Sequence, residues 1–459
     1  MSARATAQRA VSAELVRLAL PIVAVQVGLM AMGVVDSIMV GRLSAAALAG
    51  VALGNVYFYA CAVFGMGTLF ALDPLVAQAV GARDDASVTR ALQRGLLLSL
   101  ALTAPISLLL LTVRPALILL GQPADVIPIA SGYVWREIPG ILPFLAFTVL
   151  RQTLQALGRM RAIVAAIILA NVLNAGLNWV LIYGHWGAPA LGALGSAWST
   201  TISRWAMTVG LAVLAWPQLR RHLTHLRADT LAAGPLGRML ALGAPIGAQL
   251  QLEFGVFGVI GLLMGRMGTV PVAAHQIALN LASLTFMVPL GVSGAAAVLV
   301  GHAVGRGDPA GARRAARAAL TYGVGFMGCT ALVFLLVPVP FARIYSNDAP
   351  VVALAAALLP IAGVFQMFDG IQVVSIGALR GLGDTRTPFA MNLIGFWALG
   401  LPVSLALGFL TPLGPRGLWW GLVVGLGVVG LGLLARLRHR LGRTVVRVLI
   451  DEAEVAIAD

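Results

Sequence analysis

Three carboxylates lie inside otherwise apolar stretches that are each long enough to cross a lipid bilayer. They are Asp36 in GVVDSIMVG, Glu253 in QLQLEFGVF and Asp369 in VFQMFDGIQ. A charge at the bilayer centre costs about 2.5–3.5 kcal/mol even on insertion scales, so such acids are functional-site candidates by default. Their chemistry would be the binding of a proton or a small cation. The competing interpretation is a carboxylate capped by backbone groups or by an Arg, with a packing role only.

Two glutamines accompany the third of these acids. Gln366 and Gln372 lie three residues before and three residues after Asp369. This spacing places all three side chains on one face of a helix. We therefore expect the two amides to belong to a polar network or a substrate contact around Asp369.

A stripe of asparagines marks another apolar stretch, AAIILANVLNAGLNWVLIYG. Asn171, Asn174 and Asn178 recur at positions i, i+3 and i+7, which is one face of a helix. Amides in lipid either join neighbouring helices or face a polar interior. The sharper of these two interpretations is a hydrogen-bond network around Asp36.

Other charged residues in apolar segments are open to two interpretations. Asp73 precedes a proline, which favours a capped acid at a kink. Arg204 and the pair Arg136-Glu137 can be snorkelling residues or a local ion pair, or they can contact substrate.

Twelve apolar runs of about 20 residues hold these side chains, which is the length needed to span a bilayer. The chain has 459 residues, of which 59% are hydrophobic and 10% charged, and its mean hydropathy is +0.94. We predict an all-α integral membrane protein with twelve transmembrane helices. The approximate centres of the spans are Val27, Phe58, Leu100, Leu142, Leu173, Met207, Val256, Ser283, Phe326, Ala362, Gly400 and Gly425.

The basic residues predict the orientation of the chain. All 31 are Arg, and 23 of them fall on the two tails and one alternate set of loops, against 5 on the other set. By the positive-inside rule both termini are cytoplasmic, in the plasma (inner) membrane, and the number of spans is even. The net charge of +14 then indicates topology and contact with anionic lipid. The Arg residues are dispersed over short loops, so we expect no nucleic-acid partner.

The second half of the sequence repeats the first without a gap over a long stretch. When Pro21 is placed on Pro245, Gly41-Arg42 falls on Gly265-Arg266, Ala79-Val80-Gly81 on Ala303-Val304-Gly305 and Asp84 on Asp308. Six spans per half give both halves the same orientation, which is a parallel repeat. The expected organisation is two pseudo-symmetric six-helix lobes at 1–216 and 238–436, a cytoplasmic linker at 217–237, and a cytoplasmic tail at 437–459. For the tail from Arg436 to Asp459 we predict a short amphipathic surface helix.

The repeat does not duplicate the acids. Glu253 falls on Leu29, so Asp36 lies seven residues further along the equivalent helix. Seven residues are about two turns, so the two acids share a face at different depths. This asymmetry predicts a division of labour between the lobes.

Motifs of enzymes and of ATP-driven pumps are absent from the sequence. There is no HExxH, P-loop, CxxC or GxSxG pattern, and the six His residues are scattered. We expect no catalytic activity and no cofactor. Cys61 and Cys329 lie in apolar spans and form no disulfide framework.

At this point the chain resembles the multidrug and toxic compound extrusion (MATE) transporters over almost its full length. The stretches VVDSIMVGRLSAAALAGVALGN, AAHQIALNLASLTFMVPLGVSGAA and FQMFDGIQVVSIGALRGLGDTRTP carry the resemblance. Within the family it is similar to the NorM type, because it holds both the span 7 Glu and the span 10 Asp. The resemblance implies two six-helix lobes around a central cleft, and export of amphipathic, often cationic drugs in exchange for Na⁺ or H⁺.

The resemblance also implies roles for individual residues. Glu253 and Asp369 match the cation-site acids and would ligate Na⁺ in a sodium-coupled protein. Asp36, Asn174 and Asn178 match a polar network, with Thr200 as a further member. Two positions depart from the pattern and leave the coupling ion open: Phe365 replaces a Tyr of some relatives, and Asp73 is more typical of eukaryotic members.

The predicted function is therefore a cation-coupled antiporter that works by alternating access and acts as a monomer in the bilayer. Two alternatives remain. A lipid-linked oligosaccharide flippase of similar build would need a cleft rich in cationic residues, whereas the interior charges here are mainly acidic. An intramembrane enzyme would need a close catalytic pair, and none is apparent in the sequence.

Overall fold

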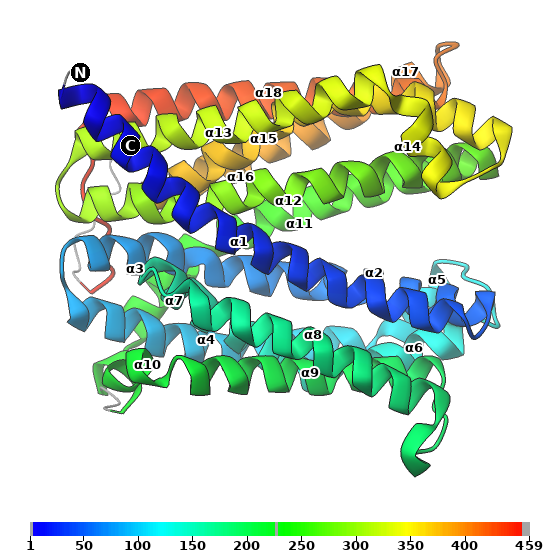
Figure 1. Cartoon of the computed structure of the whole chain (residues 1–459), viewed down its shortest axis with the longest axis horizontal. Helices are drawn as coiled ribbons and strands as arrows, with labels where there is room; N and C mark the ends of the chain where they lie inside the picture. The colour runs from blue at the N-terminus through cyan, green and yellow to red at the C-terminus, as the bar shows by residue number, and fades with distance from the viewer. Residues whose placement is uncertain (1–2, 225–227, 452–459) are drawn as a thin grey trace. The chain divides into compact units, whose positions relative to one another are not determined.

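The chain is helical throughout most of the residues that the computed structural model describes, which are 3–224 and 228–451. Figure 1 labels its elements in chain order. The first group is α1 Ala3–Gly41, α2 Ala45–Thr68, η1 Leu69–Ala71, α3 Leu72–Gly81, α4 Asp85–Leu111, α5 Val113–Leu119, α6 Ile127–Glu137, η2 Ile138–Gly140, α7 Ile141–Ala156, α8 Met160–Tyr183, η3 His185–Gly187, α9 Ala193–Leu214, α10 Trp216–Leu223 and η4 Ala228–Leu231. The second group is α11 Ala233–Arg266, α12 Thr269–Gly305, α13 Pro309–Leu336, α14 Pro338–Tyr345, α15 Ala349–Gly381, α16 Arg386–Asn392, η5 Leu393–Gly400, α17 Leu401–Phe409 and α18 Pro415–Gly442.

Eleven helical segments in the described chain are long and apolar enough to cross a membrane. Three of them are composite, because a short 3₁₀ or π segment joins two α-helices: α2–η1–α3, α6–η2–α7 and α16–η5–α17. The twelfth predicted span is α9, which has 22 residues. Its sequence SAWSTTISR is more polar than that of the other spans, and most of these Ser, Thr and Arg side chains are buried in the protein.

The described residues form two compact units. Of the described residues, unit 1 contains 3–23, 77–83 and 248–449, and unit 2 contains 24–76, 84–224, 228–247 and 450–451. Helices α1 and α11 each contribute to both units, and in each the division falls two residues after an internal proline, Pro21 or Pro245. A proline inside a helix removes a backbone hydrogen bond and favours a kink. The repeat therefore places the same helix-weakening residue at both divisions.

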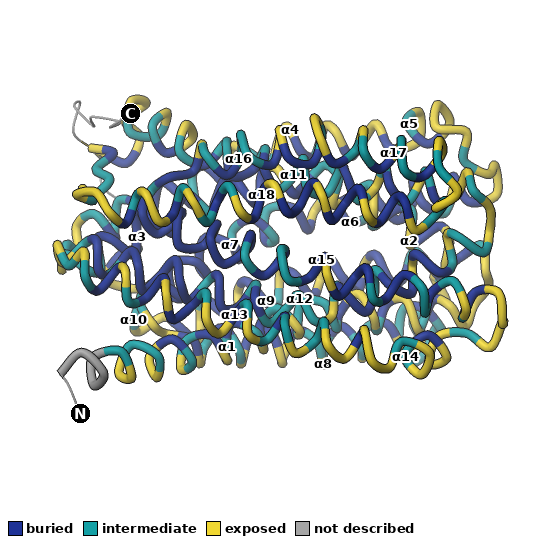
Figure 2. The backbone as a smooth tube through the Cα atoms, turned by 90° about the horizontal axis from the view of Figure 1, so that it is seen from above, coloured by how far each residue is buried: buried dark blue, intermediate teal, exposed yellow. Residues whose placement is uncertain are grey.

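Within each unit the long helices pack against one another along small and apolar residues. In unit 1, α15 packs against α12, α13 and α18, and in unit 2, α8 packs against α9, and α2 against α6. Many helices are buried along one face and exposed along the other (Figure 2). The exposed faces carry large apolar side chains, such as Leu108, Val172 and Leu262, which are 64%, 67% and 72% exposed. An apolar exterior of this kind is suited to lipid.

The two aspartates at equivalent positions of the repeat have the same structural role. Asp84 is the N-cap of α4 and accepts a hydrogen bond from the Ser87 backbone N–H at 3.0 Å. Asp308 is the N-cap of α13 and accepts one from the Gly311 N–H at 2.7 Å. An N-cap carboxylate satisfies N–H groups that have no partner within the helix. The repeated Asp is therefore a helix cap and not a site of chemistry.

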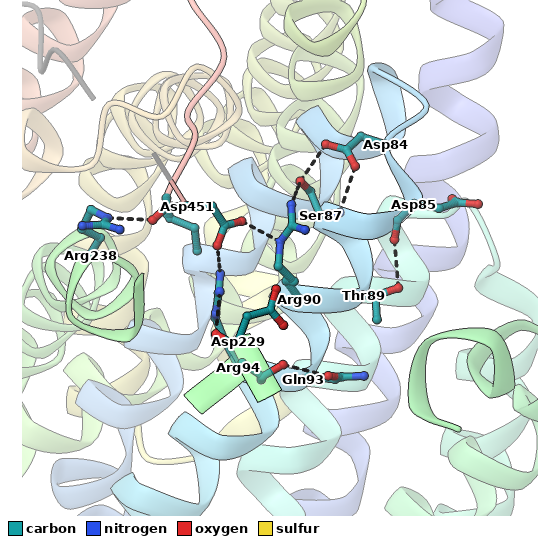
Figure 3. A network of polar contacts seen from close by, with 12 residues as sticks. Asp84, Asp85, Ser87, Thr89, Arg90, Gln93, Arg94, Asp229, Arg238 and Asp451 are labelled. Carbon is teal, nitrogen blue, oxygen red and sulfur yellow. Dashed lines mark hydrogen bonds and ion pairs between the residues drawn. The ribbon is translucent and has the colours of Figure 1, made fainter. Parts of the chain in front are cut away.

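The segment after α18 differs from the prediction. We predicted a surface helix from Arg436 to Asp459, but α18 ends at Gly442 and residues 443–450 form no helix; residues 452–459 lie outside the described chain. The Val448 N–H donates to Gln78 Oε1 at 2.7 Å, and this contact replaces the backbone hydrogen bond of a helix. A little further along, Asp451 belongs to unit 2 and contacts Arg90 and Arg94 of α4 at 2.7 and 2.6 Å (Figure 3).

Candidate functional site

Asp36 lies at the centre of a hydrogen-bond network in unit 2. Its carboxylate is 3% exposed on α1. The Asn178 amide of α8 donates to Oδ1 at 2.5 Å, and the Thr200 hydroxyl of α9 donates to Oδ2 at 2.8 Å. Three helices therefore converge on one carboxylate, which is held by neutral donors.

The asparagine stripe divides into two parts. Asn174 is fully buried and accepts from the Asn178 amide at 3.2 Å, and it also bonds Ser199 of α9, Nδ2 to Oγ at 3.3 Å. Asn171 instead donates to the Gly28 carbonyl of α1 at 3.0 Å. Asn171 thus joins two helices, as one interpretation of the stripe proposed. Asn174 and Asn178 lie in the network around Asp36, as the other interpretation proposed. Ser199 was not predicted, although its neighbour Thr200 was.

A buried ion pair lies further along α9. Arg204 Nη2 is 3.1 Å from Oε1 of Glu137, whose side chain is fully buried. The guanidinium also lies over the ring of Phe58, 4.2 Å from the ring centroid. Arg136 is not the partner of Glu137, because its Nη1 donates to the Gly132 carbonyl at 2.9 Å. Adjacency in sequence did not identify this pair, since its two members come from different helices.

Glu253 is the corresponding acid in unit 1. It is partly buried on α11, and Gln372 of α15 donates to its Oε2 at 3.5 Å. The same Gln372 amide lies 3.4 Å from Oδ1 of Asn392, at the end of α16. Asn392 was not predicted, but its signal was present, because it is an amide within the apolar run FAMNLIGFW.

Asp369 lies on α15 and is 8% exposed. It lies three residues before Gln372 on the same helix, and Gln372 is the residue that donates to Glu253. None of the three acids is exposed on the apolar exterior.

Gln366 lies apart from the acids. Its amide donates to the Thr285 hydroxyl of α12, and its Oε1 accepts from the Thr330 hydroxyl of α13 at 3.1 Å. The side chain is fully buried. Gln366 thus connects α15 to two neighbouring helices, and its hydrogen bonds do not reach Glu253 or Asp369.

Each unit also places a buried amide oxygen without a hydrogen-bond donor beside its acid. Among the described residues, no donor reaches Asn178 Oδ1, next to Asp36, or Gln372 Oε1, next to Glu253. A buried acceptor without a donor is costly and calls for a specific explanation. A carboxylate and a free amide oxygen together form a set of oxygen ligands suited to a proton or a hard cation.

A π-helical segment borders the unit 1 site. Residues 393–400 adopt a π-helix between Asn392 and α17. The indole N–H of Trp397 in this segment donates to the Leu252 carbonyl at 3.1 Å, one residue before Glu253. Short π segments inside α-helices are frequent at functional sites. No periodicity in the sequence indicated this segment.

Asp73 lies in the first turn of α3, just after η1. The Gln152 amide of α7 donates to its Oδ1, and the carboxylate is 5% exposed. This arrangement matches a capped acid at a kink. Across the described chain, no three His, Cys, Asp or Glu side chains gather as a metal site.

Apolar spans, a parallel repeat and acids inside the membrane-spanning helices define this protein as a multi-pass membrane transporter. The MatE family model matches it twice, at residues 21–180 and 245–405, so the two matches begin at the repeated prolines Pro21 and Pro245. The chain belongs to the MATE family of multidrug efflux transporters. Its members are transporters and not enzymes, and they need no cofactor.

Relatives of known type support the assignment. The chain is 39% identical over 442 residues to the probable multidrug resistance protein NorM of Bradyrhizobium diazoefficiens, covering 94% of each chain. It is 38% identical to the multidrug resistance protein PmpM of Pseudomonas aeruginosa, over 98% of this chain and 96% of that one. The resemblance to the NorM type is thereby confirmed.

Solved structures confirm the fold class. The eukaryotic MATE transporter AtDTX14 superposes with a TM-score of 0.86 at 22% identity, over 96% of this chain and 100% of that one. The Vibrio cholerae MATE transporter VcmN, in its bent form, gives a TM-score of 0.83 at 22% identity, over 95% and 98%. The all-α fold with twelve membrane-spanning helices is therefore correct.

Proposed function

We propose that this transporter is an antiporter that exports amphipathic, often cationic drugs in exchange for Na⁺ or H⁺. The observation that carries the proposal is the pairing, in each unit, of a buried carboxylate with a buried amide oxygen that lacks a donor. The printed hydrogen bonds to the two carboxylates come from neutral side chains, Asn178 and Thr200 at Asp36 and Gln372 at Glu253. Such a site gains stability when a proton or a cation enters it.

Coupling follows if the ion and the drug favour different conformations. We propose that Glu253 and Asp369 bind the ion, and that Asp36 with Asn174, Asn178 and Thr200 forms the second site. Entry of the ion removes repulsion between the two unit 1 acids, and a cationic drug competes for the same negative charge in the opposite state. Gln372 supplies the amide oxygen for the ion, whereas Gln366 holds α15 in place.

The moving bodies in this proposal are the two lobes, 1–216 and 238–436, joined by the linker 217–237. Pro21 lies inside the first lobe and Pro245 inside the second, and each weakens its own helix, which suits it as a bend within its lobe. The Arg distribution supports cytoplasmic termini in the inner membrane, and we propose a monomer as the working unit.

Drug efflux from cells that express the variants tests the proposal. We expect E253Q and D369N to export a cationic dye at no more than about a tenth of the wild-type rate while reaching the membrane in equal amount. N171A, which alters a helix-joining amide, is the matched control and should export normally. If both acid variants export the dye normally with the ion gradient intact, Glu253 and Asp369 do not couple ion entry to drug export.

The coupling ion is decided by a second assay. Replacing Na⁺ by K⁺ at constant pH stops export if Na⁺ is used, and collapsing the pH gradient stops it if H⁺ is used. Independence of both gradients would contradict antiport. Because family membership already makes the protein a multidrug efflux transporter, neither result alters that class.

A further inference from the structure

Two grooves flank the first half of α13. The α1–α13 groove has a volume of about 770 Å³ and includes Arg17 and Tyr322. The α13–α18 groove has a volume of about 670 Å³. We define the second groove by six of its lining residues: Arg313, Arg317, Leu320, Leu437, Arg438 and Leu441. Both grooves belong to unit 1.

The α13–α18 groove is strongly cationic. Three Arg residues line it, and no carboxylate does. Arg313 is held in place, since its Nη1 donates to the Leu441 carbonyl at 3.1 Å. Arg317 and Arg438 are exposed, and within the described chain neither makes an ion pair. Two guanidinium groups therefore remain available to one anion.

The internal repeat shows that this face of the helix is covered in the first half. In the register that places Asp84 on Asp308, Arg313 and Arg317 of α13 correspond to Thr89 and Gln93 of α4. Thr89 Oγ1 contacts His222 Nδ1 of α10 at 2.7 Å. Gln93 donates to the His222 carbonyl at 2.7 Å and is only 3% exposed. In the first half, α10 and η4 thus pack over this face of α4. The equivalent face of α13 is the one that carries Arg313 and Arg317.

The second half shows no equivalent cover within the described chain. The chain that follows α9 forms α10, whereas the chain that follows α18 is not helical and bonds Gln78 through the Val448 N–H. None of the described residues after Gly442 lines the groove. The uncovered face bears two Arg where its counterpart bears neutral side chains, so its chemistry favours an anion as the cover.

The apolar residues of the groove indicate which kind of anion would bind there. Leu320 is partly exposed and lies one turn beyond Arg317 on α13, further from the helix start. The start of α13 meets the end of α18 through the Arg313–Leu441 hydrogen bond, so Leu320 lies deeper than the groove mouth. Charge at the mouth and apolar surface below it match a phosphate headgroup with acyl chains.

We propose that the α13–α18 groove binds one anionic phospholipid, with its phosphate between Arg317 and Arg438 and its chains against Leu320. The proposed orientation of the termini assigns this lipid to the cytoplasmic leaflet. Basic pockets between transmembrane helices on that side are known to accept anionic headgroups. The lipid would replace, in the second half, the cover that α10 gives to the first.

Native mass spectrometry of the full-length protein in detergent tests the proposal. Wild-type protein titrated with phosphatidylglycerol should bind one lipid with preference over phosphatidylcholine. In R317Q/R438Q this binding should weaken by about tenfold or more, because both guanidinium contacts to the phosphate are lost. R317K/R438K should keep most of it.

The control variant is R159Q/R161Q, which removes two exposed Arg from the start of α8, outside both grooves. It should bind lipid like the wild type. Equal weakening in both double variants, or equal binding of phosphatidylcholine and phosphatidylglycerol, would overturn the proposal. Inorganic phosphate that displaces the lipid at millimolar concentration would also overturn it, because the groove would then recognise free phosphate.

The assay contains no ion gradient and no drug, so its result does not depend on antiport. A variant impaired in the proposed coupling, E253Q, should still bind phosphatidylglycerol. Monodispersity and melting temperature of each variant in the same detergent show whether it is folded. A folded R317Q/R438Q protein that retains full lipid binding would contradict the inference directly.

Discussion

Arg204 of α9 forms a buried ion pair with Glu137 of α6, with 3.1 Å between Nη2 and Oε1. One turn earlier on α9, Thr200 donates its hydroxyl to Asp36 at 2.8 Å. The ion pair therefore fixes the helix that carries one of the donors to Asp36. The ion pair is therefore a structural support for the candidate site. It also explains why a charged residue, Arg204, lies inside α9.

Removing one charge of this pair should lower the stability of the protein more than removing both charges. E137L leaves Arg204 as an uncompensated buried charge, which costs about 3–5 kcal/mol. The double variant E137L/R204M removes both charges, so it should be more stable than E137L. Thermal unfolding of the purified proteins in one detergent measures the difference. If the destabilisation of E137L/R204M equals the sum of the destabilisations of E137L and R204M, the two residues do not act as a pair.

The network around Asp36 predicts graded effects on transport. D36N removes the charge but preserves the size of the side chain, so the protein should fold and lose most of its efflux. T200V removes one hydroxyl donor, which contributes about 1 kcal/mol, and should reduce efflux severalfold. Dye efflux normalised to the amount of protein in the membrane gives both values.

T208V serves as the matched control for T200V. Thr208 lies on the same helix two turns later, and its hydroxyl donates to the Pro143 carbonyl at 2.7 Å, away from Asp36. Both variants lose a buried hydroxyl on α9, but only T200V should alter the concentration of Na⁺ or H⁺ that gives half-maximal efflux. An identical shift in T208V would show that the effect comes from helix packing.

Much of this architecture was readable from residue types and spacing. The spans follow from apolar length, and the stripe of Asn174 and Asn178 does lie beside Asp36, because a buried acid must find polar neighbours. The repeat was visible through Asp84 and Asp308, whose capping geometry permits few other residues.

What the sequence did not reveal depends on contacts between distant segments. The partner of Glu137 comes from a different helix, and the sequence left Arg136, Glu137 and Arg204 open between snorkelling, a local ion pair and substrate contact. The non-helical segment after Gly442 makes its contact with Gln78, which no pattern within residues 436–459 encodes. The π-helix at 393–400 likewise follows from packing and not from periodicity.

Trp397 should influence ion binding at Glu253 by positioning the backbone beside it. W397F removes the indole N–H that donates to the Leu252 carbonyl but keeps an aromatic ring in the π segment. We expect a severalfold shift in the ion concentration for half-maximal efflux, with a small change in the maximal rate, because Glu253 follows Leu252 directly. W205F is the control, since Trp205 makes a similar bond to the Pro139 carbonyl at 3.0 Å in unit 2. Equal effects of the two variants would deny Trp397 a positioning role.

The linker side of unit 2 contains a pH-sensitive contact. His222 is 1% exposed, its Nδ1 lies 2.7 Å from Thr89 Oγ1, and the Arg221 Nε–H donates to its Nε2 at 3.0 Å. Because the Thr89 hydroxyl already donates to the Asp85 carbonyl, the imidazole N–H is on Nδ1 and Nε2 is the acceptor. Burial lowers the pKa of His222, and the Arg221 guanidinium lowers it further, while Asp85 partly opposes this.

A lowered histidine pKa makes the folded state bind protons less readily than the unfolded chain. The stabilisation by neutral His222 is complete above the ordinary pKa of about 6.5 and decreases as the pH falls toward the folded-state value. Melting temperature in detergent should therefore fall as the pH is lowered from neutral to mildly acidic, and H222Q should show a smaller fall. H439Q, at an exposed histidine of α18, should retain the wild-type pH dependence. Parallel curves for wild type and H222Q would mean that protonation of this imidazole does not limit stability in acid.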